Sequence, residues 1–377
     1  MLFRSWDTVP PLELKGRPPV VDASRFVTRF PIKHVVFIIK ENRTFNTYFA
    51  TYPGATGSTV GGTIACDGST CRPGPDVALT PAQDVQKDLA HCFYCGLVAI
   101  DGGRMDGFNA MTGVTGIDTP IDGRDLAGYT YFDRADLPNY WAYADRFVLA
   151  DRFFTSMYGP TTPEHLYAIA ADADGLIDIG NKGDDARVYC DDPEDSGAAF
   201  RSLLPGEIPT IMDLERRIDE SPAAFAGLRE YWTQRRYCID IPTVIDELQA
   251  KGIPWRFYAN ENQVQNVLQI VKHLREGSAW DNLAPPESFV RDVGVGDLPA
   301  VSWLIPPWYY NEHPWEFSDG SGNSVCAGEN WTTHQINAIM QSPAWSSTVI
   351  VVVWDDFGRS EEHTSELQSQ STISYAV

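Results

Sequence analysis

The chain has 377 residues, 43% of them hydrophobic, and a formal net charge of −22 at pH 7. This is enough for one large folded domain or two ordinary ones. The acidic balance excludes nucleic acid as an expected partner, because phosphate backbones are bound by basic surfaces. No segment approaches the roughly 18 consecutive apolar residues of a membrane span, so no transmembrane segment is predicted.

The first strong element follows an irregular start. Residues 1–30 lack regular periodicity and the apolar centre of a signal peptide, so we expect an irregular leader. The β-branched run 34–40 predicts a buried strand, and residues 51–80, rich in Gly, Thr, Pro and Asp, predict a long surface loop.

Three cysteine pairs are candidates for disulfides: Cys66 with Cys71, Cys92 with Cys95, and Cys190 with Cys238. The first pair flanks a short turn and the last brackets a charged insertion, which indicates loop-stapling disulfides and an oxidising compartment. The middle pair has zinc or redox spacing, but no second such motif follows. We expect it to be a disulfide or two buried thiols.

The rest of the chain alternates between helix and strand patterns, interrupted by an acidic insertion around 172–240. Helices are predicted over 137–146, 163–171, 243–251, 263–275 and 329–340, and strands over 147–154, 255–258, 300–305 and 348–354. This alternation predicts an α/β fold with a mostly parallel sheet covered on both faces.

Two of the predicted strands end in oxygen-bearing side chains. Strand 34–40 runs into Glu41 and Asn42, and strand 348–354 runs into Asp355 and Asp356. Polar residues commonly end a buried strand, and for either strand alone that is the simpler interpretation. Ligands of parallel sheets gather at the carboxyl edge, so the two ends together predict a site for a divalent cation.

The segment Gly159–His165 has two compatible interpretations. Thr161 and Glu164 have the spacing of a capping box at the start of a helix. A hydroxyl at that position also lies where free N–H groups favour an anion, so Thr161 is a candidate nucleophile for phosphorus. His91, and His313 in a loop after a strand, are candidates for protonating a leaving oxygen or binding phosphate.

These motifs together resemble a known family. Residues 38–45 (IIKENRTF) resemble the opening motif of the bacterial phosphoesterases that include non-specific phospholipases C and AcpA-type acid phosphatases. Further stretches agree in the same order: 102–108, 159–167, 312–314, 328–330 and 354–358. The resemblance covers roughly residues 31–358, which would form one phosphoesterase domain.

The resemblance implies an alkaline-phosphatase-like fold, a three-layer α/β/α sandwich with a mostly parallel sheet. It implies that Glu41, Asn42, Asp355 and Asp356 bind a divalent metal ion, which these ligands allow to be Ca²⁺, Mg²⁺, Mn²⁺ or Zn²⁺. Thr161 would be the nucleophile of a phosphoenzyme mechanism, with His91 and His313 around the phosphoryl group. A phosphate ester, either a phospholipid or a phosphomonoester, would be the substrate, and the protein would be secreted or periplasmic.

Other functions stay open beside this one. A non-catalytic, metal-stabilised extracellular binding protein on the same fold is the alternative of a different class. A sulfatase or a phosphonate-transferring enzyme of the same superfamily is a weaker option, because sulfatases use a modified cysteine or serine in another local motif.

The last residues have a different origin. Residues 359–369 (RSEEHTSELQS) and 373–377 (ISYAV) resemble the in-frame translation of a common sequencing adapter. We therefore expect residues 359–377 to be non-native and the phosphoesterase domain to be incomplete after Gly358. The family motif continues there with a second glycine, an aromatic residue and Asp-His, so we expect this fragment to be inactive while its longer parent is a phosphoesterase.

Overall fold

The computed structural model describes residues 32–67, 70–111, 126–180, 189–218, 222–355 and 371–375. Its main element is a seven-stranded sheet in the order β12-β11-β13-β1-β14-β15-β8. The strands are β1 (His34–Lys40), β8 (Val148–Ala150), β11 (Trp255–Tyr258), β12 (Leu283–Ala284), β13 (Val301–Leu304), β14 (Thr348–Trp354) and β15 (Ser371–Tyr375). Neighbours from β12 to β14 pair in parallel, and β15 pairs antiparallel with β14 and β8.

This architecture confirms the predicted α/β class and the mostly parallel sheet. The predicted strands 34–40, 255–258 and 348–354 coincide with β1, β11 and β14. The predicted strand 147–154 is shortened to the three residues of β8. The expected leader, residues 1–30, lies outside the described residues, as does most of the segment 359–377.

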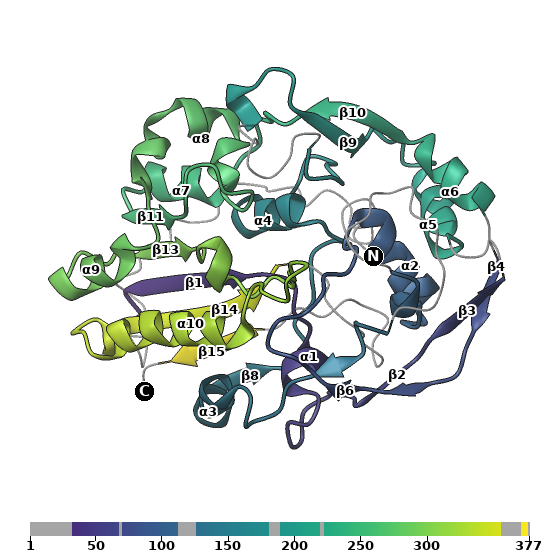
Figure 1. The fold of residues 1–377 in the computed structure, drawn as a ribbon. Coiled ribbons are helices and arrows are strands. Elements are labelled where there is room, and N and C mark those ends of the chain that lie inside the picture. The colour runs from purple at the N-terminus through teal and green to yellow at the C-terminus, as the bar shows by residue number, and fades with distance from the viewer. Residues whose placement is uncertain are drawn as a thin grey trace.

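Helices pack against both faces of the sheet, as Figure 1 shows. Successive residues of a strand point to opposite faces, so Ile39 joins one apolar cluster while Val36 and Ile38 join the other. The first cluster includes α4 (Thr161–Ala170), α7 (Val244–Ala250) and α8 (Lys272–Glu276). The second includes α1 (Phe45–Phe49), α3 (Pro138–Arg146), α9 (Ser288–Val295) and α10 (Val325–Met340).

The segment 172–240, which the sequence predicts to be an insertion, forms regular elements that pack against α2 (Phe93–Ile100). It contains β9 (Ser196–Phe200), α5 (Ile208–Arg216), α6 (Pro222–Arg229) and β10 (Trp232–Arg236). Strands β9 and β10 form an antiparallel ribbon, which lies above α4 in Figure 1. The disulfide Cys190–Cys238 links the segment before β9 to the segment after β10, as the sequence predicts.

The expected loop over 51–80 is wrong, because this segment holds short strands. These are β2 (Val60–Gly61), β3 (Ile64–Asp67), β4 (Thr70–Pro73) and β5 (Val77–Ala78), and β6 (Thr80–Pro81) follows and pairs with β7 (Thr130–Tyr131). The hairpin of β3 and β4 places Cys66 opposite Cys71. Helix α2 (Phe93–Ile100) starts at a Cys92–Cys95 disulfide, which is one of the two predicted options.

The predicted helix 263–275 is also wrong. In this range the chain forms a short 3-10 helix at Val267–Gln269 and then the short helix α8, which begins at Lys272. The amide of Ile239 donates to the carbonyl of Ile270 at 2.9 Å, and the amide of Lys272 donates to the carbonyl of Ile239 at 2.7 Å. This pairing with a distant segment uses backbone groups that a continuous helix would need. Among the described residues, none of the helices has the length and apolarity to cross a membrane.

Candidate functional site

The two strand ends singled out in the sequence lie side by side. Strands β1 and β14 pair in register as far as Lys40 and Trp354, so the next residues leave the sheet together. The amide of Asp355 donates to the carbonyl of Lys40 at 3.0 Å, and the amide of Asn42 donates to Asp355 Oδ1 at 3.3 Å. Glu41, Asn42 and Asp355 are all buried. Asp356, the fourth predicted ligand, lies outside the described residues.

Helix α4 adds a residue that the sequence interpretation missed. His165 is buried, and its Nε2 lies 3.4 Å from Asp355 Oδ2. Glu41, His165 and Asp355 place one ligand atom each within 4.8 Å of one another. A signal for His165 is present in the sequence, because it follows Thr161 by four residues and therefore lies on the same face of the helix.

The chemistry of these donors fits a divalent cation. Within the described part of the chain, neither side-chain polar atom of Asn42 and neither ring nitrogen of His165 makes a hydrogen bond. Burying such groups without a partner costs roughly 1–3 kcal/mol each. A cation coordinated by the amide oxygen and the imidazole nitrogen would remove that cost, and the carboxylates of Glu41 and Asp355 would balance its charge.

Thr161 is the first residue of α4 and is only 5% exposed. Its hydroxyl therefore lies at a helix N-terminus, one turn before His165. The predicted capping box is wrong: Pro160 precedes the helix without a side-chain cap, and Glu164 instead accepts from the amides of Met157 (2.9 Å) and Ser156 (3.3 Å). Burial raises the pKa of Glu164 well above its ordinary value.

The two predicted histidines lie together beside the carboxylates. The ring centroids of His91 and His313 are 5.2 Å apart, and His313 Nε2 lies 3.9 Å from Glu41 Oε2. Asp88, which the sequence interpretation also missed, lies 3.5 Å from His91 Nδ1. Burial lowers the pKa of His313, and although burial alone would raise the pKa of Asp88, His313 and His91 lower it.

A buried ion pair between Lys40 and Glu312 adjoins these residues in the chain. Lys40 Nζ and Glu312 Oε1 are 2.8 Å apart and both side chains are fully buried. Glu312 also accepts from the hydroxyls of Tyr48 and Tyr140, both at 2.6 Å, and from Trp354 Nε1 at 3.0 Å. One carboxylate thus joins β1, β14, α1 and α3.

The partners of Glu312 are chain neighbours of candidate site residues. Lys40 precedes Glu41, Trp354 precedes Asp355, and Glu312 itself precedes His313. The backbone carbonyl of Glu312 accepts from two nitrogens of Arg43, which follows Asn42. The network therefore fixes the residues that directly adjoin the candidate site residues at the ends of β1 and β14.

Gly328 of α10 makes room for this network. A Cβ at Gly328 would clash with Glu312 Cγ and would lie 2.9 Å from the carbonyl oxygen of Tyr310. The next residue, Glu329, accepts from the amides of Asn139 and Tyr140 in the first turn of α3, both at 2.9 Å. The motif 328–330 therefore supports the site without lining it.

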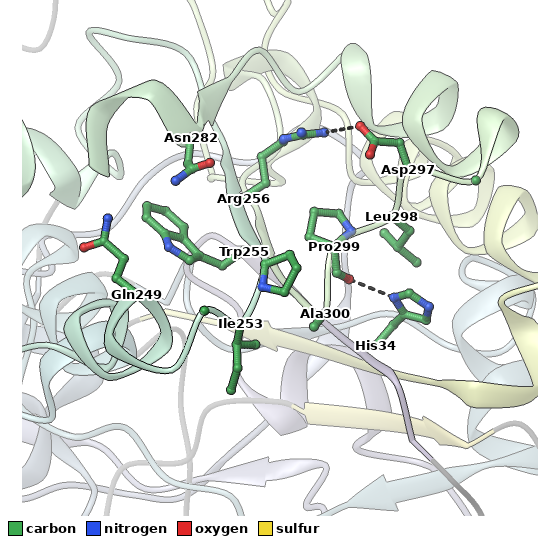
Figure 2. A pocket seen from close by; sticks show the side chains of 13 residues that line it. His34, Gln249, Ile253, Trp255, Arg256, Asn282, Asp297, Leu298, Pro299 and Ala300 are labelled. Atoms are coloured by element: carbon green, nitrogen blue, oxygen red, sulfur yellow. Dashed lines mark hydrogen bonds and ion pairs between the residues drawn. The ribbon is translucent and has the colours of Figure 1, made fainter. Parts of the chain in front are cut away.

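The opposite edge of the sheet holds a separate cavity of about 520 Å³, where β1, β11 and β13 begin. Figure 2 shows His34 against the carbonyl of Pro299 (2.8 Å) and Arg256 paired with Asp297 (3.2 Å). None of the candidate site residues that the structure describes lines it. Ligands of parallel sheets bind at the carboxyl ends of the strands, so this cavity is not the candidate active site.

Known proteins are similar to this chain over most of its length. A family model described as "Phosphoesterase family" matches residues 32–363. The chain is 26% identical over 352 residues to hemolytic phospholipase C of Pseudomonas aeruginosa, covering 89% of this chain and 43% of that protein. It is 23% identical over 366 residues to phospholipase C A of Mycobacterium tuberculosis, covering 89% and 59%.

A plant protein is similar to the same degree. The chain is 22% identical over 341 residues to non-specific phospholipase C6 of Arabidopsis thaliana, covering 88% of this chain and 54% of that protein. The chain thus spans about half the length of the curated relatives it matches.

Proposed function

Since the chain belongs to the Phosphoesterase family, we propose that the buried centre at the ends of β1 and β14 hydrolyses phosphate esters with a divalent metal ion. One observation carries the proposal: Glu41, His165 and Asp355, from three separate segments, bring ligand atoms within 4.8 Å of one another inside the protein. Buried charges of one sign are stable when they coordinate a cation. The fold that goes with this function is a three-layer α/β/α sandwich of the alkaline-phosphatase type.

The metal would be held by Glu41, Asn42, Asp355 and Asp356, with His165 as an additional nitrogen ligand. A donor set of carboxylates and one imidazole favours Mn²⁺ or Zn²⁺ over Ca²⁺ and Mg²⁺, which prefer oxygen ligands alone. When bound, the ion supplies positive charge that lowers the pKa of a nearby hydroxyl and stabilises the phosphoryl oxygens.

Thr161 is the proposed nucleophile. Its Oγ1 releases its proton to solvent as it attacks phosphorus, and the bond from phosphorus to the alcohol oxygen breaks, which leaves the phosphoryl group on Thr161. His91 protonates the departing oxygen, while His313 and the free N–H groups at the start of α4 bind phosphoryl oxygens. Water then hydrolyses the phosphothreonine in a second step and regenerates the hydroxyl.

A phospholipid is the proposed substrate class, with a phosphomonoester as the second option. The names of the relatives, phospholipases C, support it. The loop beside His313 also exposes Tyr309, Tyr310 and Phe317, which would suit a lipid surface. The Cys92–Cys95 and Cys190–Cys238 disulfides support secretion or a periplasmic location.

Two measurements on the same variants test the function. In calorimetric titrations, Thr161→Ala should bind Mn²⁺ as tightly as the unaltered chain, whereas Asp355→Asn should bind it at least about tenfold more weakly. After incubation with p-nitrophenyl phosphate and an acid quench, mass spectrometry should find one phosphoryl group on Thr161 and none in Thr161→Ala. The fragment is expected to be inactive in complete turnover, but transfer of the phosphoryl group to Thr161 needs only the first half of the reaction, so this measurement can be made on the chain as it stands.

The alternative function gives the opposite pattern. A metal-stabilised binding protein would bind Mn²⁺ through the same carboxylates but would never carry phosphate on Thr161. Normal metal binding with no phosphorylation by p-nitrophenyl phosphate or by a short-chain phosphatidylcholine would therefore favour that alternative.

A further inference from the structure

A cavity of about 510 Å³ lies between α2 and α5, which is within the usual size range of small-molecule sites. Its lining residues come from the end of α2, the turn that follows, Tyr158 and α5. The described ligands of the proposed metal ion, Thr161 and the two site histidines do not contribute to its wall. A ligand of this cavity would therefore be a molecule other than the phosphate ester.

The glycines at the start of the motif 102–108 shape the cavity. Gly102 and Gly103 follow α2 and have φ values of 63° and 102°, in the region that favours glycine. A Cβ at Gly102 would lie 2.9 Å from the carbonyl oxygen of Arg216, the last residue of α5. The glycine turn thus allows the C-terminal ends of α2 and α5 to lie close together.

One carboxyl group in the cavity wall has no partner. Glu215, the second-last residue of α5, lines the cavity and is only 7% exposed. Its Oε1 is enclosed, whereas Oε2 is not, and neither oxygen makes a hydrogen bond to a described residue. Arg216, the basic residue among the lining residues, pairs with Asp213 instead. Because a buried carboxylate without a counter-charge is unfavourable, Glu215 favours a cation in the cavity.

The two helix ends favour a cation at the same place. Helix α2 ends at Ile100 and α5 ends at Arg216, and both residues line the cavity. The carbonyl groups at a helix C-terminus together carry about half a negative elementary charge. Leu97, Ile100 and Met212 supply apolar surface beside these charges. The wall therefore fits a ligand that is cationic at one end and apolar at the other.

We propose that this cavity binds an amphiphilic primary amine, whose ammonium group pairs with Glu215 and whose alkyl portion contacts the apolar wall. A primary ammonium has three N–H donors, which the carboxylate oxygens accept in charge-assisted hydrogen bonds. A quaternary ammonium has no such donor and would leave the oxygens without hydrogen bonds. This site is additional to the proposed function and does not depend on it.

Calorimetric titration of the full chain with hexylamine tests the proposal. At about pH 8 the amine is protonated, and Glu215, whose pKa burial raises to about 7, is ionised. 1-Hexanol has the same alkyl chain without the charge and should bind at least about tenfold more weakly. Hexyltrimethylammonium keeps the charge but lacks N–H groups, and should bind roughly fivefold more weakly than hexylamine.

Three variants assign the binding to this cavity. Glu215→Gln keeps the shape of the side chain but removes its charge, so hexylamine should bind about tenfold more weakly while 1-hexanol binds as before. Met212→Ser removes part of the apolar wall and should weaken the binding of both probes by roughly threefold. Glu230→Gln removes the same charge from an exposed residue outside the cavity, and should bind both probes like the unaltered chain.

The outcomes decide the proposal even if one variant does not fold. Equal affinity of the unaltered chain for hexylamine and 1-hexanol would overturn it, and so would equal affinity for hexylamine and hexyltrimethylammonium. Hexylamine binding that Glu215→Gln leaves unchanged would show that the ammonium group does not pair with this carboxylate. Phosphorylation of Thr161 is measured separately, so failure of the amine site leaves the proposed hydrolysis standing, and the reverse also holds.

Discussion

Glu215 in α5 is a buried carboxyl group beside a cavity of about 510 Å³ with apolar neighbours such as Leu97, Ile100 and Met212. Its Oε1 makes no hydrogen bond to any described residue. Burial raises the pKa of this carboxyl from 4.5 to about 7. The folded chain therefore keeps a proton that the unfolded chain releases between these two pH values.

Because Glu215 keeps its proton in the folded state, the stability of the fold should depend on pH. Because the folded state binds more protons than the unfolded state between pH 4.5 and about 7, the free energy of unfolding should fall as the pH rises through that window. Once the pH exceeds both pKa values of Glu215, this group lowers the free energy of unfolding by about 3 kcal/mol. Glu215→Gln, which stays neutral, should lose this dependence and be more stable than the unaltered chain at about pH 8. Urea denaturation at about pH 5 and about pH 8 measures it, and equal pH slopes for the two proteins would contradict it.

The site residues differ in how readily the sequence predicts them. Glu41 and Asp355 follow apolar runs typical of parallel strands, and the parallel pairing of β1 with β14 suffices to bring them together. His165 is harder to predict, because the pattern at the start of the helix indicates a cap and a nucleophile and points to no role for the residue one turn further along the same face. Asp88 lies in a loop with no periodicity, so only the three-dimensional structure places it beside His91.

At the scale of elements, the Glu312 network could not be predicted from the sequence. The side chains that meet there come from positions 40, 48, 140 and 354, and no local pattern links such distant residues. The predicted helix 263–275 does not form for a similar reason. Local propensity favours a helix, but pairing with Ile239, in another part of the chain, takes the backbone groups.

The network predicts a specific response to charge removal. Glu312→Gln keeps the shape of the side chain but leaves Lys40 without its buried counter-charge, which should cost about 3–5 kcal/mol of the free energy of unfolding. Because its partners adjoin Glu41 and Asp355, Mn²⁺ affinity should also fall by about ten- to a hundredfold. Urea denaturation and calorimetric titration measure the two effects.

A double variant separates the two effects of Glu312→Gln. Adding Lys40→Met removes the stranded charge, so Glu312→Gln with Lys40→Met should regain stability relative to Glu312→Gln alone. The affinity for Mn²⁺ should stay low, because the side chain at position 312 still does not fix the ends of β1 and β14. Recovery of both properties together, or loss of stability with unchanged Mn²⁺ affinity, would show that the network stabilises the fold without positioning the ligands.

At the scale of the whole molecule, the last strand of the sheet comes from the segment expected to be non-native. Residues Ser371–Tyr375 form β15, which pairs antiparallel with β14 from Val349 to Val353 and also with β8. Strand pairing uses backbone groups, and the edge of a sheet accepts many sequences for this reason. Strand β15 is also the only link between β8 and the rest of the described sheet.

Ending the chain after Gly358 should therefore expose the edge of β14 and detach β8 from the sheet. We expect a lower free energy of unfolding, since each lost backbone hydrogen bond contributes about 1 kcal/mol, and we expect self-association through the open edge. Urea denaturation and light scattering after size-exclusion chromatography measure the two effects. The matched control replaces residues 359–370 with a Gly/Ser linker of equal length, which keeps β15 and should behave like the unaltered chain. If the shortened chain is as stable as the control and stays in the same oligomeric state, β15 contributes nothing to the fold and the natural partner of β14 must be sought elsewhere.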